Sequence, residues 1–183
     1  MKISEVDILL LPDLGGAAPG HWLRRWAERF GTGRLIEHED STRPKRAEWL
    51  KAIEREIMMS TRPVVLVAHG LAVSAVVHVA QRLVDTKVRG AFLVAPPDHE
   101  TGDLPPAARE LGNVPRDPLP FPSMLVASTD DRSCSIDSAV DLATAWGAEL
   151  HLARNAGHID LESGHGPWPE GLLIFTRLMQ RLR

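Results

Sequence analysis

The chain has 183 residues, of which 44% are hydrophobic and 25% are charged, and its formal net charge at pH 7 is −3. These values are typical of one globular domain with a sizeable core, so we expect a single domain over residues 1–183. The charge balance provides no basic face, which argues against nucleic acid as a partner.

The distribution of apolar residues and cysteine bears on the compartment. Acidic residues interrupt the N-terminus before a signal-like apolar region forms, and no apolar run approaches the ~20 residues that a membrane span needs. The one cysteine, Cys134, excludes an internal disulfide and fits a reducing compartment. We therefore expect a cytoplasmic protein that does not associate with membranes.

Short apolar segments alternate with segments of helical periodicity along the whole chain. Strands are predicted at 6–11, 34–37, 64–67, 88–95, 124–127 and 149–153. Helices are predicted at 22–30, 45–59, 71–79, 136–146 and 169–182. This alternation predicts an α/β fold, with a central, mostly parallel sheet of about six strands and helices on both faces. Eight prolines in residues 96–122 predict a loop-rich connection that could form a pocket wall or a small lid, and no large cap domain is expected.

Residues 63–79 read as a buried strand that passes through a tight turn into a helix. The turn, residues 68–72, has the frame of a nucleophile elbow, in which small flanking residues surround a strained central residue. The central residue is Gly70, where the elbow motif has serine. The alternative interpretation of this segment is an ordinary connection between a strand and a helix.

Other polar or glycine-rich loops follow the first, fifth and sixth predicted strands. Gly15 and Gly16 follow the first, and they indicate either an oxyanion-hole loop or a flexible turn. Asp131 and His158 follow two later strands, so the order along the chain is elbow, acid, histidine, as in an α/β-hydrolase triad. In such a triad the histidine is the general base and the aspartate orients it. Asp131 could instead cap a helix, and Gly-His pairs are common in loops.

The chain resembles, nearly end to end, the retinoblastoma-binding protein 9 type of small serine hydrolases. The resemblance is carried by Pro12 with Gly15-Gly16 and Gly20-His21-Trp22, by residues 68–72 and 128–131, and above all by residues 156–159 and 163–171. It implies a single-domain α/β-hydrolase fold and an esterase-like acyl hydrolase without a cofactor. It also implies that Asp131 is the triad acid, rather than Asp130, and that His158 is the base.

The sequence departs from this family at its nucleophile, because Gly70 replaces the serine. No acyl-enzyme can form at a residue without a side-chain oxygen. The backbone N–H of Leu71 and a second N–H near Gly15 could still form an oxyanion hole. The expected substrate pocket consists of Leu14, Gly16, His21, Trp22 and Trp168, although burial of the two tryptophans in the core is an equal alternative.

Three explanations of Gly70 remain open at this point. The chain could be a pseudoenzyme that binds a small ester or acyl ligand, or a protein partner. It could retain hydrolysis in which His158 activates water directly. It could also carry a serine-to-glycine change introduced into an active hydrolase, in which case Gly70→Ser would restore ester turnover.

Other candidate groups have plainer interpretations. His69 is expected to pack under the turn. Ser74 lies one helical turn beyond the elbow and should point away from it, and Cys134 lies on the acid loop rather than at an elbow. His158, Asp160, Glu162 and His165 suggest a metal cluster, but no zinc motif spacing is present and the block matches a metal-free loop of the family, so no metal is expected.

Overall fold

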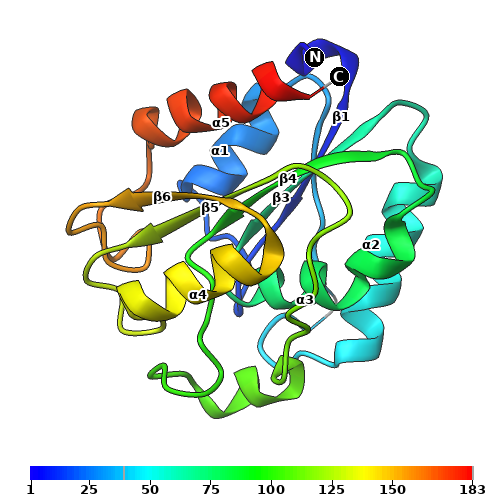
Figure 1. The fold of residues 1–183 in the computed structure, drawn as a ribbon. Coiled ribbons are helices and arrows are strands. Elements are labelled where there is room, and N and C mark those ends of the chain that lie inside the picture. Colours follow the sequence, from blue (N-terminus) through cyan, green and yellow to red (C-terminus); the bar gives the residue numbers. More distant parts are fainter. Residues whose placement is uncertain (39, 183) are drawn as a thin grey trace.

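The structure is a computed structural model, which describes residues 1–38 and 40–182. Its centre is a six-stranded sheet with the strand order β2-β1-β3-β4-β5-β6, and every neighbouring pair is parallel (Figure 1). The strands are β1 (Asp7–Leu11), β2 (Gly33–Leu35), β3 (Val64–His69), β4 (Val88–Val94), β5 (Ser123–Ser128) and β6 (Glu149–Ala153). The predicted α/β fold class is confirmed.

Helices cover both faces of this sheet (Figure 1). They are α1 (Trp22–Arg29), α2 (Arg46–Met59), α3 (Leu71–Ala80), α4 (Ile136–Trp146) and α5 (Pro169–Arg181). Helices α1 and α5 lie together on one face, and α2, α3 and α4 lie on the other. None of the helices in residues 1–38 and 40–182 combines the length and apolar character that crossing a bilayer requires.

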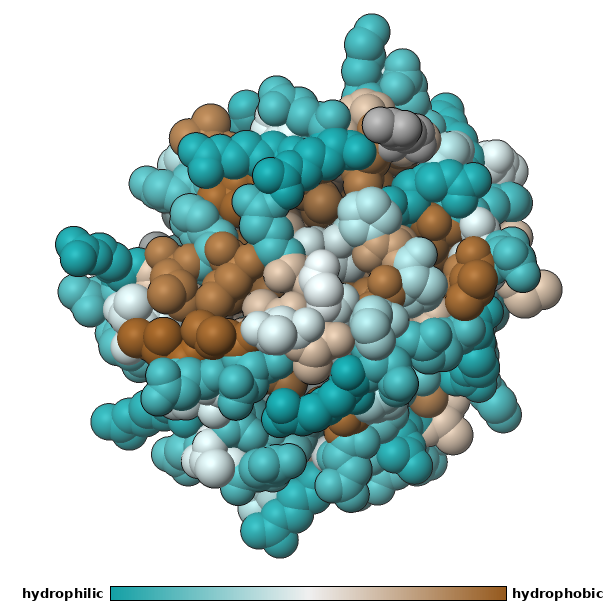
Figure 2. Space-filling model, in the orientation of Figure 1, coloured by the Kyte–Doolittle hydropathy of each residue, from teal (hydrophilic) through white to brown (hydrophobic). Residues whose placement is uncertain are grey.

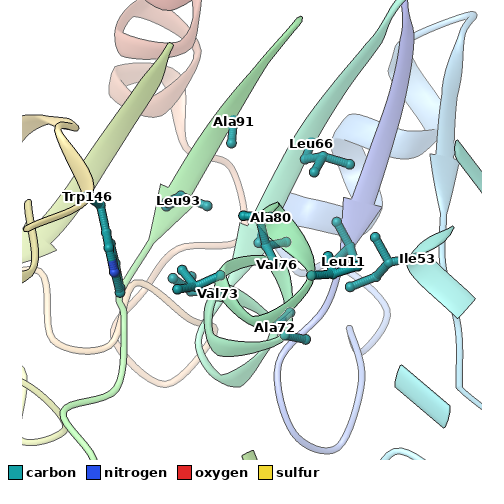
Figure 3. Close-up of a cluster of buried hydrophobic side chains, with 14 of the residues drawn as sticks. Leu11, Ile53, Leu66, Ala72, Val73, Val76, Ala80, Ala91, Leu93 and Trp146 are labelled. Carbon is teal, nitrogen blue, oxygen red and sulfur yellow. The ribbon is translucent and has the colours of Figure 1, made fainter. Parts of the chain in front are cut away.

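Each face of the sheet carries its own apolar core because successive strand side chains point in opposite directions. In β1, Leu9 and Leu11 pack with α2 and α3, whereas Ile8 and Leu10 pack with α1 and α5. Figure 3 shows the first core, in which Leu66 of β3 and Val76 of α3 lie close to Leu11. Strands buried on both faces explain the continuous apolar runs in the sequence.

Every predicted strand and helix is present, and each boundary lies within two residues of its predicted position. The second strand was expected at 34–37 and occupies Gly33–Leu35. The proline-rich connection of residues 96–122 contains one 3-10 helix, Pro106–Leu111, within an otherwise irregular path. The strand boundary differs because the apolar pattern there is weak, whereas the connection is mostly irregular, as predicted, because its prolines remove backbone donors.

The surface is polar over most of the face in view, with a hydrophobic patch near the sheet edge (Figure 2). Strand β6 forms this edge, and α4 lies beside it. Half-exposed apolar side chains of these two elements include Ile136, Val140 and Leu152.

Packing against the Trp168 indole requires a glycine at position 171 of α5. A Cβ on Gly171 would lie 2.2 Å from atoms of the Trp168 indole, which is buried and stacked at 5.9 Å on Trp26. We expect Gly171→Ala to lower the free energy of unfolding by about 1–3 kcal/mol, because the indole cannot move away without disturbing the aromatic core. Chemical denaturation measures this change.

The matched control is Leu173→Ala in the same helix. The Leu173 side chain is 68% exposed, so the free energy of unfolding should change by no more than about 0.5 kcal/mol. A Gly171→Ala protein as stable as the original, or more stable, would contradict the packing argument, because alanine is intrinsically the better helix former.

Candidate active site

The elbow between β3 and α3 has the backbone geometry of a strained turn. Gly70 has φ 55° and ψ −126°, a conformation that residues with a side chain rarely adopt. A Cβ on Gly70 would lie 2.1 Å from Cγ of Asp13, and 2.3 and 2.4 Å from its two carboxylate oxygens. The space for a side chain at position 70 is therefore already filled by Asp13.

Asp13 reaches this position because β1 and β3 are neighbours in the sheet. Leu11 pairs with Ala68, so the loops that follow these residues leave the same edge of the sheet side by side. The backbone N–H of Leu71 donates to Oδ1 of Asp13 at 2.6 Å. The Asp13 side chain is 22% exposed, so it remains accessible from one side.

His158 joins two carboxylates. Its Nε2 lies 3.0 Å from Oδ2 of Asp13, and its Nδ1 lies 2.8 Å from Oδ2 of Asp131. Asp131 is almost completely buried, and its other oxygen accepts from the Ser133 N–H at 2.8 Å. The structure thus brings the predicted acid and histidine together and adds Asp13 as a third member.

The charge state of this group follows from its hydrogen bonds. Burial alone would lower the pKa of His158, but the hydrogen bonds to Asp13 and Asp131 outweigh burial and raise the pKa to about 10. Burial opposes ionisation of Asp13, but its hydrogen bond with His158 keeps its pKa below the ordinary value. At neutral pH the group is a carboxylate, an imidazolium and a second carboxylate in a row.

Several bonds fix the loop that carries His158. His69, a buried side chain, donates from Nε2 to the His158 carbonyl at 2.9 Å. Trp22 donates from Nε1 to the carbonyl of Ile159 at 2.8 Å, and Asp130 accepts from the Gly157 N–H at 2.8 Å. Asp130 therefore acts in loop structure, while the neighbouring Asp131 contacts the imidazole.

A cavity of about 260 Å³ opens onto Asp13. Its lining consists of Asp13, Leu14, Gly16, Ala18, His21, His69, Asp160, Leu161 and Glu162. Burial, followed by the nearby His69, lowers the pKa of His21 to about 4, so this imidazole is neutral. The expected pocket residues Leu14, Gly16 and His21 therefore do face a common cavity.

Three expected site residues lie elsewhere. Trp22 and Trp168 are buried in the core, with ring centroids 4.9 Å apart, and do not line the cavity beside Asp13. The alternative that buries both indoles is the one observed. The backbone N–H of Gly15 donates to the Ser41 carbonyl at 2.9 Å, so this N–H does not face the elbow as an oxyanion donor.

The remaining nucleophile candidates are unsuited by their surroundings. Burial, with the nearby Asp98 and Asp131, raises the pKa of Cys134 to about 12, which keeps the thiol protonated. The Ser74 hydroxyl is buried and hydrogen-bonded to Nε2 of His99 at 2.8 Å rather than to His158. Within residues 1–38 and 40–182, no group of three or more His, Cys, Asp or Glu side chains is arranged to hold a metal ion.

Asp13 is the functional candidate that sequence reasoning missed. It follows Pro12 directly at the end of β1, beside the glycine pair that was considered only for its backbone N–H groups. Two features together could have identified it: an elbow without a side chain, and a carboxylate at the carboxyl end of the neighbouring strand.

Comparisons with known proteins agree with this architecture. The family model described as serine hydrolase matches residues 8–177. A YdeN-like hydrolase of Pectobacterium atrosepticum is 30% identical, with a TM-score of 0.87, and the match covers 97% of this chain and 93% of that one. No curated protein matches the chain.

Two more distant structures show the same fold. A hydrolase of the alpha/beta superfamily from Xanthomonas campestris pv. campestris is 21% identical, with a TM-score of 0.60 and coverage of 97% and 99%. The esterase domain of a Rhodothermus marinus protein is 15% identical, with a TM-score of 0.69 and coverage of 96% and 87%.

The raised pKa of His158 makes stability depend on pH. An ordinary histidine has a pKa near 6.5, so between about pH 6.5 and 10 the folded state binds a proton that the unfolded state has lost. The stabilisation is complete below pH 6.5 and is lost as the pH rises through about 10. We expect the free energy of unfolding to fall across this range, by at most about 1.4 kcal/mol per pH unit.

Urea denaturation at several pH values measures this slope. His158→Gln, which cannot titrate, is the control that subtracts other alkaline titrations. If the two proteins have the same slope, His158 is not held as an imidazolium.

Proposed function

Because this chain belongs to the serine hydrolase family, we propose that it uses the family's site as a binding pocket for a small neutral ligand and does not hydrolyse carboxylic esters by the serine mechanism. The observation that supports this most directly is the Asp13 carboxylate, which fills the volume of the missing nucleophile. The protein is in this sense a pseudoenzyme of its family.

Serine-type hydrolysis needs a nucleophile, a neutral general base and free oxyanion donors. Gly70 supplies no hydroxyl. His158 faces a carboxylate through each ring nitrogen, so it is protonated and cannot accept a proton from a hydroxyl. The Leu71 N–H already donates to Asp13. Gly70 thus leaves the first requirement unmet, and the position of Asp13 leaves the other two unmet.

Direct activation of water by His158 toward an ester is disfavoured by the same contacts. A general base must be unprotonated at working pH, and the two carboxylates hold the imidazole in its charged form. We therefore do not assign to this site the function of the Rhodothermus marinus esterase domain.

The ligand we propose is a small ester or acyl compound without a negative charge. The cavity beside Asp13 has apolar lining from Leu14, Ala18 and Leu161, which suits a short hydrocarbon group. Asp160 and Glu162 line it as well, and their charge disfavours a free carboxylate ligand. A protein partner is the alternative occupant.

Two finer assignments accompany this proposal. We infer membership of the retinoblastoma-binding protein 9 type within the family, supported by residues 156–159 and 163–171. We also infer a cytoplasmic location, supported by the single buried thiol of Cys134.

Hydrolysis of p-nitrophenyl butyrate tests the proposal. The original chain and Gly70→Ser alone should both be inactive, because a serine side chain at position 70 would collide with Asp13. The double variant Asp13→Gly with Gly70→Ser frees the volume, the Leu71 N–H and one ring nitrogen of His158. Its turnover should exceed that of the original chain by about 100-fold or more.

His158→Ala in each background is the control, and circular dichroism verifies folding. The gain in the double variant should vanish with His158→Ala. Turnover by the original chain that is lost with His158→Ala would show that the protein is an ester hydrolase. Binding of the intact ester by the original chain is followed through the amide resonances of Leu14 and Gly16, and no shift at saturating ester would refute the binding pocket.

A further inference from the structure

Asp13 presents a charged oxygen to the cavity at the place where the family has its serine hydroxyl. We propose that Asp13 is the nucleophile of a different hydrolytic reaction, in which its carboxylate displaces a leaving group from a saturated carbon and water then cleaves the resulting ester. The inference rests on the proposed function in one respect, namely that a small neutral ligand enters the cavity beside Asp13.

The two oxygens of Asp13 have different surroundings. Oδ1 accepts from the Leu71 N–H at 2.6 Å, and Oδ2 lies 3.0 Å from Nε2 of His158. A carboxylate oxygen has more than one lone pair, so Oδ2 can contact His158 and still attack a ligand. The geometry therefore resembles a nucleophile beside its histidine, with the backbone donor already in place.

The chemistry of a carboxylate selects the substrate class. When a carboxylate attacks the carbonyl of an ester, the intermediate expels the carboxylate, a far weaker base, more readily than the alkoxide, so attack is unproductive. At a saturated carbon no such intermediate forms, and a halide leaves irreversibly in dilute solution. Asp13 is thus unsuited to esters and suited to small alkyl halides.

The first step forms one bond and breaks one. An electron pair of Asp13 Oδ2 forms the bond to carbon, and the carbon–halogen bond breaks with its pair leaving on the halide. The product is an uncharged alkyl ester of Asp13. Asp160 and Glu162 line the same cavity, and their negative charge favours release of the halide to solvent after the carbon–halogen bond has broken.

The second step is hydrolysis of the alkyl ester of Asp13, and it uses the same residues after Asp13 has lost its charge. Alkylation neutralises Asp13, so only Asp131 still faces His158 as a charged hydrogen-bond acceptor, and Nε2 can release its proton to solvent. Neutral His158 then takes a proton from a water molecule that attacks Cγ of Asp13. Negative charge develops on Oδ1, where the Leu71 N–H stabilises it.

Collapse of this intermediate restores the enzyme. The bond between Cγ and the alkylated oxygen breaks, the alcohol leaves with the second proton of the attacking water, and Asp13 is again a carboxylate beside protonated His158. The sum is alkyl halide plus water giving alcohol, halide and a proton. No cofactor or redox partner enters the balance.

The test uses 1-bromobutane as the probe and bromide release as the readout. We expect the original chain to release bromide over many turnovers and Asp13→Asn to release none. His158→Gln should stop after a single equivalent, with one butyl group on the peptide that contains Asp13 in mass spectrometry. Asp141→Asn, which changes an exposed carboxylate of α4 outside this cavity, should behave as the original chain does.

Isotope labelling distinguishes whether Asp13 acts as a nucleophile or as a general base. In a single turnover in H₂¹⁸O, the nucleophile route gives butanol with ¹⁶O and leaves ¹⁸O in Asp13. Butanol with ¹⁸O in that first turnover would mean that Asp13 only activates water, and this would overturn the proposal. A folded protein that neither releases bromide nor acquires a butyl group on Asp13 would overturn it equally.

Failure of this inference can be told apart from failure of the proposed function. Hydrolysis of p-nitrophenyl butyrate by the original chain concerns only the proposed function and does not require Asp13 to be alkylated. If the chain binds the ester but releases no bromide from 1-bromobutane, the proposed binding pocket stands and Asp13 is not a nucleophile.

Discussion

The site depends on the hydrogen-bonded row of Asp131, His158 and Asp13. It connects the loops that follow β5, β6 and β1, and it places a cation between two carboxylates. One imidazolium cannot neutralise two carboxylates, so a negative charge remains. The Leu71 N–H, at the start of α3, takes up part of that charge, because helix N-termini present unpaired donors and positive potential. The remaining charge resides on the oxygens that face the cavity.

The Asp13 carboxylate can occupy its position only because residue 70 has no side chain. A side chain at position 70 and the carboxylate of Asp13 require the same space, since a Cβ would approach Cγ to 2.1 Å. Glycine at the elbow is therefore a condition for the carboxylate to bind the Leu71 N–H and His158. It also removes the backbone strain that a larger residue would suffer at φ 55°. The glycine at position 70 and the carboxylate of Asp13 are therefore two parts of one arrangement.

The sequence predicted the fold well because its signal is local. Apolar runs mark each strand, the helical stripes between them mark the crossovers, and parallel topology follows from their alternation. The pairing of Asp131 with His158 was also predictable, because both follow strands whose carboxyl ends meet at one edge. The position of Asp13 was not, since it depends on the register between Leu11 and Ala68 and on the turn of a loop. The direction of the Gly15 N–H depends on a contact with Ser41, which no local pattern encodes.

The buried charges need an explanation that stability alone does not provide. Taking three charged groups from water costs several kcal/mol per ion, and apolar replacements of similar volume are often at least as stable. Asp131 is 3% exposed and Asp13 is 22% exposed, so the row is deeply buried at one end and open to the cavity at the other. A purely structural ion pair has no need of an accessible end. The accessible oxygens, the adjacent backbone donor and the proton on His158 are the components of a reaction, and this is why we assign chemistry to Asp13.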